Sequence, residues 1–123
     1  MKTNDKELAA AYVRYYREGA EADEWALDEL HELAIDQPER AWNIIKIINT
    51  IPIEDEAWRE FVHGMLGCGA LEELVALHEE SMLPVITEAA KSDPVLRSEL
   101  TTIYESSISP NAWSQIRVVL GRK

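Results

Sequence analysis

Apolar residues recur every three or four positions along most of the chain, which is the spacing of one buried face of an α-helix. The pattern predicts helices over residues 5–19, 23–35, 38–51 and 70–80, one opening at residues 54–56, and further ones beginning near Ser81, Asp93 and Asn111. In residues 38–51 the apolar side chains cover well over half of the circumference, which indicates the buried centre of the N-terminal half. No segment has the two-residue period of a strand. We therefore expect an all-α fold, seven or eight short helices packed as hairpins in a single domain, residues 1–123.

The middle of the chain carries a glycine-rich junction, with Gly64, Gly67 and Gly69 ahead of an acidic amphipathic run. This composition predicts a helix end followed directly by a helix start. Gly67 would close the first helix in a left-handed conformation, and Gly69 would cap the second. Glu72 and Glu73 would then stabilise the first turn of the second helix, with Glu72 in reach of the free amide of Gly69.

Residues 32–40 and 88–97 have a similar pattern. In each segment a predicted helix ends, an aspartate and a proline follow, and a new helix begins. Proline is tolerated in the first turn of a helix, so both segments are typical of ordinary helix punctuation. If they instead mark a true repeat, the helices form an array of hairpins resembling HEAT-type solenoids.

Charge is the strongest compositional signal: the 123 residues carry 23 acids against 12 Lys and Arg, a formal net charge of −11. Such a surface repels nucleic acid and anionic membranes and attracts basic partners, although acidity also serves plain solubility. No apolar stretch approaches the roughly 20 residues that span a bilayer. The single cysteine, Cys68, cannot form an internal disulfide. These features favour a cytoplasmic protein and leave its oligomeric state open.

The acids are unevenly distributed, because no Lys or Arg interrupts them between Arg17 and Arg40 or between Arg59 and Lys91. Trp25 lies among these acids and off the apolar stripe of its own helix. It therefore either packs against the first helix or serves as an aromatic anchor for a partner. The candidate partner-binding residues are Asp23, Glu24, Trp25, Asp28, Glu29, Glu32, Glu54, Asp55, Glu56, Glu72, Glu73, Glu79 and Glu80.

Two histidines follow a carboxylate by three residues, the spacing of ligands in di-iron helical bundles: Glu60 precedes His63, and Asp28 precedes His31. Such a site needs ligands that point into the core. A helical wheel places all four side chains off the apolar faces of their helices. In a chain this acidic the spacing arises by chance, so we expect no metal and no cofactor.

His78 falls within the stripe formed by Leu71, Leu74 and Val75, which favours a core or interface histidine bonded to a carbonyl. Cys68 precedes a predicted helix N-terminus, a setting that can activate a thiol, but no motif pairs it with a base. The sequence shows no phosphate-binding loop, dinucleotide fingerprint, zinc-ligand set or serine elbow. The residues therefore indicate no specific catalytic chemistry.

Several spaced motifs are also found in a known family: Trp25-x-x-Asp28-x-Leu30-x-x-Leu33, Pro38-Glu39-x-Ala41-Trp42-x-Ile44, Gly69-x-Leu71-Glu72-x-Leu74-Val75-x-x-His78, Ala89-Ala90 and Asp93-Pro94-x-x-Arg97-x-x-Leu100. Through them residues 23–113 resemble an uncharacterised family of small, acidic, all-helical bacterial proteins. The middle motif of that family reads Gly-Pro-Leu-Glu-Asp-Leu-Leu followed by His-Gly, and this chain departs from it with Ala70, Glu73 and Glu79. The resemblance implies an all-α fold and a bacterial origin, and it brings no activity.

Three hypotheses of function follow. The first is a non-enzymatic protein-binding module, most concretely a bacterial immunity or antitoxin protein whose acids occlude the Lys and Arg of a basic toxin. The second is a DNA mimic, such as an anti-restriction or anti-CRISPR protein, which requires rows of acids at phosphate-like spacing. The third is a small enzyme or metal-binding protein that uses Glu60, His63, Glu72 or His78.

Overall fold

The computed structural model describes residues 4–122, and the secondary structure in that range is entirely helical. The helices are α1 (Asp5–Glu18), α2 (Trp25–Asp36), α3 (Pro38–Thr50), α4 (Glu56–Leu66), α5 (Glu72–Leu77), α6 (Glu79–Ala90), α7 (Pro94–Leu100) and α8 (Pro110–Val119). Two short 3-10 turns, η1 (Glu21–Asp23) and η3 (Glu105–Ser107), and a π-helical segment, η2 (Gly67–Leu71), complete them. The predicted all-α class is confirmed. Residues 1–3 and 123, which the single-domain prediction included, lie outside the described residues.

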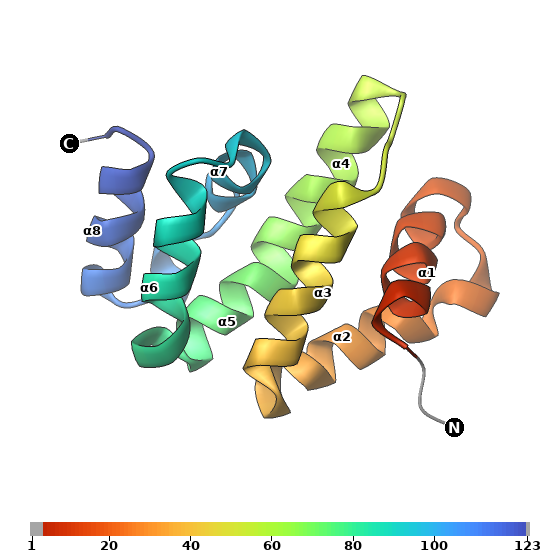
Figure 1. Ribbon diagram of the computed structural model, residues 1–123, viewed down its shortest axis with the longest axis horizontal. Coiled ribbons are helices and arrows are strands. Elements are labelled where there is room, and N and C mark those ends of the chain that lie inside the picture. The colour runs from red at the N-terminus through yellow and green to blue at the C-terminus, as the bar shows by residue number, and fades with distance from the viewer. Residues whose placement is uncertain (1–3, 123) are drawn as a thin grey trace.

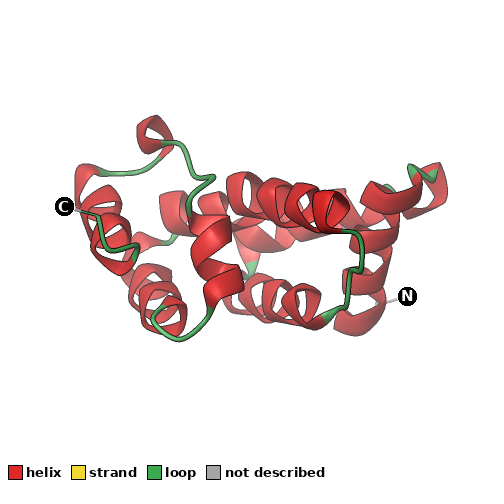
Figure 2. Cartoon of the chain, turned by 90° about the horizontal axis from the view of Figure 1, so that it is seen from above, coloured by secondary structure: helices red, strands yellow, loops and turns green. Residues whose placement is uncertain are grey.

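The helices follow one another along the body, from α1 and α2 at one end to α8 at the other (Figure 1). Helix α3 packs against both α1 and α2, and α6 packs against α5, α7 and α8. Seen from above, the body is elongated (Figure 2), and α1 and α8 lie towards its opposite ends. Neighbouring helices therefore pack pairwise, as hairpins do, and the likeness to HEAT-type repeats stays a prediction.

The core centres on α3, as its apolar pattern predicts. Ile44, Ile45 and Ile48 are completely buried there. They belong to one cluster with apolar residues from all the other α-helices. At about 25 cal/mol for each Å² of apolar surface removed from water, this shared burial is the main stabilising term.

Most helix boundaries lie where the sequence places them. Asn4 caps α1 by accepting the Glu7 amide at 2.7 Å, and Gly19 ends that helix at a left-handed φ of 67°. Asp23 does not cap α2, which corrects the prediction. Asp23 is the last residue of η1, and Glu24 stands between it and α2. The carboxylate of the buried Asp23 pairs with Arg14 of α1 at 3.0 Å instead.

The glycine junction is not a break between two helices, and that prediction is wrong. Helix α4, the π-helical segment η2 and α5 follow one another without a loop, and Gly67 has ordinary right-handed angles, φ −64° and ψ −51°. Gly67 serves close packing instead. A Cβ added there would lie 2.2 Å from both the carbonyl oxygen of Glu99 and the Oγ1 of Thr102. Only glycine lets α7 approach this closely.

The acids after the junction are also placed differently from the prediction. Because Gly69 lies inside the helical run, its amide is not a free cap position, and Glu72 accepts the backbone N–H of Tyr104 at 2.8 Å instead. Helix α6 likewise begins before Ser81, at Glu79, so Pro84 lies in its interior rather than in its first turn.

Candidate functional site

His63 is buried in the core, which corrects the prediction that it faces away from it. The residue is 7% exposed, and its Nδ1 lies 2.7 Å from the Oε2 of Glu99 on α7. Glu99 is completely buried, and its Oε1 accepts the side-chain amide of Asn49 on α3 at 3.0 Å. The helical wheel failed here because α7 covers the polar side of α4 and places a carboxylate against it.

These three side chains, Asn49, His63 and Glu99, form the Glu99 cluster. Burial raises the pKa of the Glu99 carboxyl, and the hydrogen bonds from His63 and Asn49 oppose that rise. The Oδ1 of Asn49 is buried and has no partner among the described residues. Folded proteins pair nearly all their buried polar atoms with hydrogen-bond partners. Burying this cluster, with that oxygen unpaired, therefore lowers the stability of a small apolar core.

The Glu99 cluster opens onto a pocket of about 310 Å³ between α4 and α7, here called the His63 pocket. Its lining residues are Arg59, Glu60, His63, Gly64, Val95, Ser98, Thr101 and Thr102. Within the described residues the Nε2 of His63 has no hydrogen-bond partner, yet it is not sealed from solvent. At the rim, Arg59 donates from Nη1 to the carbonyl of Ile53 at 2.9 Å, which holds its guanidinium in place. The pocket therefore combines an oriented imidazole with an anchored cation.

His78 takes no part in this pocket. Its Nε2 donates to the carbonyls of Ala34 and Ile35, at 2.9 and 3.0 Å, at the C-terminal end of α2. The prediction of a histidine bonded to a carbonyl is confirmed. Of the four residues in the enzyme hypothesis, only Glu60 and His63 share a pocket, because Glu72 is bonded to Tyr104 and His78 caps α2.

Five of the candidate partner-binding acids are engaged within the molecule. These pairs are Asp23 with Arg14, Asp55 with the Trp58 amide, Glu72 with the Tyr104 amide, Glu73 with His31, and Glu79 with Ser109 and Asn111. The hydrogen bonds from Ser109 and Asn111 lower the pKa of Glu79. Four of these acids join different segments of the chain and Asp55 caps its own helix, so all five already have a partner within the protein.

The remaining candidates lie in separate places. Glu24, at the N-cap position of α2, and Asp28 and Glu32 within that helix are exposed and follow one another at four-residue steps. Glu29 is half-buried on the same helix, and Glu80 is exposed in the first turn of α6. Glu54 and Glu56 are exposed at the start of α4, at the edge of the molecule opposite α2 (Figure 1). The candidates therefore do not form one continuous surface.

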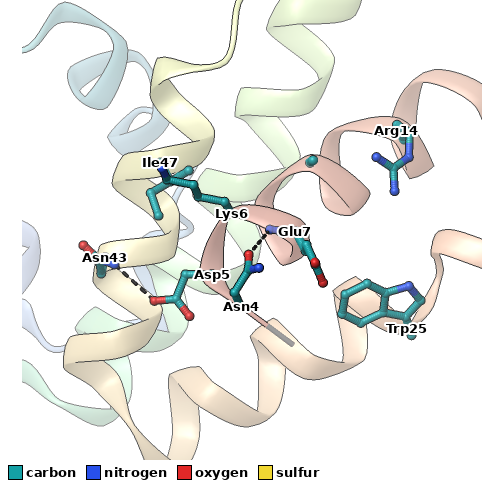
Figure 3. A pocket seen from close by; sticks show the side chains of 9 residues that line it. Asn4, Asp5, Lys6, Glu7, Arg14, Trp25, Asn43 and Ile47 are labelled. Carbon is teal, nitrogen blue, oxygen red and sulfur yellow. Dashed lines mark hydrogen bonds between the residues drawn. The ribbon is translucent and has the colours of Figure 1, made fainter. Parts of the chain in front are cut away.

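Trp25 lines a hollow of about 890 Å³ between α1, α2 and α3, here called the Trp25 hollow. The indole is 37% exposed and lies across the hollow from Asn43 and Ile47 (Figure 3). Asn43 donates to Asp5 at 3.2 Å, which fixes the polar rim on that side. Trp25 shares this hollow with residues of α1 and keeps part of its surface exposed, and its role as a partner anchor stays a prediction.

The comparison with protein families gives one informative result. The model of a family of unknown function, DUF6869, matches residues 15–123. The chain belongs to this family. No curated protein and no solved structure matches it.

The DUF6869 match covers the whole His63 pocket and the exposed row of acids on α2. The part of the Trp25 hollow that residues 4–14 form precedes it. Over residues 4–122, no helix is both long and apolar enough to cross a bilayer. The same range holds no group of three or more His, Cys, Asp or Glu side chains arranged to bind a metal ion.

The His31–Glu73 pair, which lies at the surface, makes the stability of this DUF6869 protein depend on pH. The hydrogen bond to Glu73, 2.5 Å long, raises the pKa of His31. The pair therefore stabilises the fold fully below the unfolded histidine pKa of about 6.5, and this stabilisation is lost as pH rises through the folded value. Because the pair is exposed, we expect less than about 1 kcal/mol. Urea unfolding of the wild type and of Glu73→Gln at pH values on both sides of that range should show a larger loss of stability with rising pH in the wild type. An equal slope in both proteins would contradict the assignment.

Proposed function

We propose that this protein is a non-enzymatic binding module that docks a basic partner protein through the exposed face of α2. The most concrete form is a bacterial, cytoplasmic immunity or antitoxin-type inhibitor, in which the acids cover the Lys and Arg that its partner uses elsewhere. The observation that carries the proposal is the row formed by Glu24, Asp28 and Glu32. All three are exposed, and within residues 4–122 none of them forms an ion pair, although Asp28 and Glu32 help to raise the pKa of His31.

The energetics of this row support a binding role. Like charges four residues apart destabilise a helix by a few tenths of a kcal/mol per pair. Some acids elsewhere in this protein are matched by a cation, as Asp23 is by Arg14 and Asp5 is by Arg40, whereas among the described residues the three acids of this row are not. A basic partner would relieve the repulsion along the row and would be attracted over a distance of about one Debye length, roughly 8 Å at physiological salt.

Trp25 lies at the N-terminal end of the row and supplies the apolar part of the proposed interface. Tryptophan is enriched among the residues that dominate binding energy, and such residues are usually surrounded by polar contacts. A ring that is 37% exposed beside a hollow can be covered further by a partner side chain. In such an interface the acids raise the association rate by attracting the basic partner, and burial of the indole lowers the dissociation rate.

A matched pair of charge variants tests the proposal. One variant carries Glu24→Lys, Asp28→Lys and Glu32→Lys, and the control carries the same changes at Glu54, Glu56 and Glu80, so that both have the same net charge. Tagged wild type and variants are purified from the native host, and the association rate of each co-purified protein is measured.

We expect the α2 variant to lose a protein that the wild type and the control retain. The association rate with that protein should fall at least about tenfold between low and physiological salt. Trp25→Ala should raise the dissociation rate at least about tenfold. Equal recovery by the two charge variants, or an association rate that ignores salt, would refute the proposal.

A further inference from the structure

The His63 pocket shares no residue with the exposed row on α2, and one of its lining side chains, His63, belongs to the Glu99 cluster. Glu99 is completely buried against His63. If the two side chains share one proton, the pair has no net charge. If that proton is lost, a net negative charge is buried, and burial disfavours such a state strongly.

The shared proton has a consequence for the other nitrogen of the ring. In one arrangement Glu99 is a carboxylate and His63 an imidazolium. In the other, Glu99 is a carboxylic acid that donates to the Nδ1 of a neutral imidazole. Both arrangements place a hydrogen on Nε2, because Nδ1 faces Glu99 in each. With one shared proton, Nε2 therefore carries a hydrogen that has no protein partner among the described residues, on a side chain that lines the pocket.

We propose that the His63 pocket binds a small organic carboxylate, with the Nε2–H of His63 and the guanidinium of Arg59 as its donors. A carboxylate suits a guanidinium because both are planar and their donors and acceptors match in pairs. Gly64, Val95 and the methyl group of Thr102 offer apolar contact for the carbon skeleton of the ligand. Glu60 is the only acid that lines the pocket within the described residues, and it opposes binding.

Nuclear magnetic resonance tests the site directly with isobutyrate as the probe. Isobutyramide has the same shape without the charge, and inorganic phosphate is an anion of another class. We expect saturable shifts of the amide signals of Gly64, Ser98 and Thr102 with isobutyrate, at the millimolar affinity that so few atoms allow. Isobutyramide should give none. Shifts of equal size with isobutyramide, stronger binding of phosphate, or no saturation with isobutyrate would each overturn the assignment.

Variants separate the donors from the rest of the protein. Arg59→Gln and His63→Gln should each weaken isobutyrate binding at least about tenfold, the effect of one charge-assisted hydrogen bond. Glu60→Gln should strengthen it a few-fold. Arg122→Gln, an exposed residue outside the pocket with the same change in net charge, should have no effect. Arg59 and Glu60 are exposed, so these two variants test the site even if His63→Gln disturbs the fold. Equal responses to Arg59→Gln and Arg122→Gln would refute a specific site.

The position of the hydrogen is measured separately. Long-range proton–nitrogen correlation spectra of the wild type near neutral pH should show a protonated Nε2 on His63. An unprotonated Nε2 would make the ring an acceptor and would exclude the proposed role in carboxylate binding.

Discussion

Replacing Gly67 by alanine should lower the free energy of unfolding by about 3 kcal/mol or more, the upper range for overpacked positions. The added Cβ would lie 2.2 Å from the carbonyl oxygen of Glu99 and 2.9 Å from its carbonyl carbon. Backbone atoms cannot move aside as a flexible side chain can, so α7 must shift away from the helical run. The gain of about 1 kcal/mol that alanine normally brings to a helix is too small to offset this.

Gly69 provides the matched control for Gly67. It lies two residues further on in the same π-helical segment, and a Cβ added there meets nothing within 4 Å. Gly69→Ala should therefore leave the stability unchanged or raise it by up to about 1 kcal/mol. Thermal unfolding distinguishes the two, with a midpoint roughly 10 °C lower for Gly67→Ala alone. Equal midpoints would show that Gly67 is not needed for the approach of α7.

The all-α class and most helix boundaries follow from local signals. Proline and capping residues act within one helical turn, so the starts of α1, α3 and α7 can be read from Asn4, Pro38 and Asp93 alone. The same holds for the carbonyl bond of His78, since a histidine inside an apolar stripe must find a polar partner nearby.

The two features that sequence reasoning missed around the candidate site, the role of Gly67 and the burial of His63, both depend on α7. Glycine permits both a left-handed turn and a close approach, and only the carbonyl of Glu99 beside Gly67 decides between them. His63 has a polar position on α4, and it becomes buried because Glu99 covers it from a segment far along the chain. The one signal for Glu99 was an acid between Leu96 and Leu100 on a short helix, where apolar residues flank it. Pairings over this distance leave no periodic trace in the sequence.

Truncation of His63 to alanine should lower the free energy of unfolding by about 3 kcal/mol, because it leaves Glu99 buried without its partner. The other oxygen of Glu99 keeps only the amide of Asn49, at 3.0 Å. The exposed counterpart is His31, which also pairs with a glutamate, Glu73. His31→Ala should cost less than about 1 kcal/mol, since water replaces the lost contact. Urea unfolding measures both variants, and equal losses would mean that the Glu99 cluster is more hydrated than its burial indicates.

The decisive variant removes the whole Glu99 cluster by Asn49→Leu, His63→Leu and Glu99→Met. Apolar groups of similar size often replace a buried polar network at little or no loss of stability. We therefore expect the free energy of unfolding of the triple variant to lie within about 1.5 kcal/mol of the wild-type value. If it does, folding does not require the cluster, and the proposed presentation of His63 to the pocket would account for its presence. Isobutyrate binding should then be absent from a well-folded protein. If the triple variant is instead less stable than His63→Ala, the network is a structural element of the core.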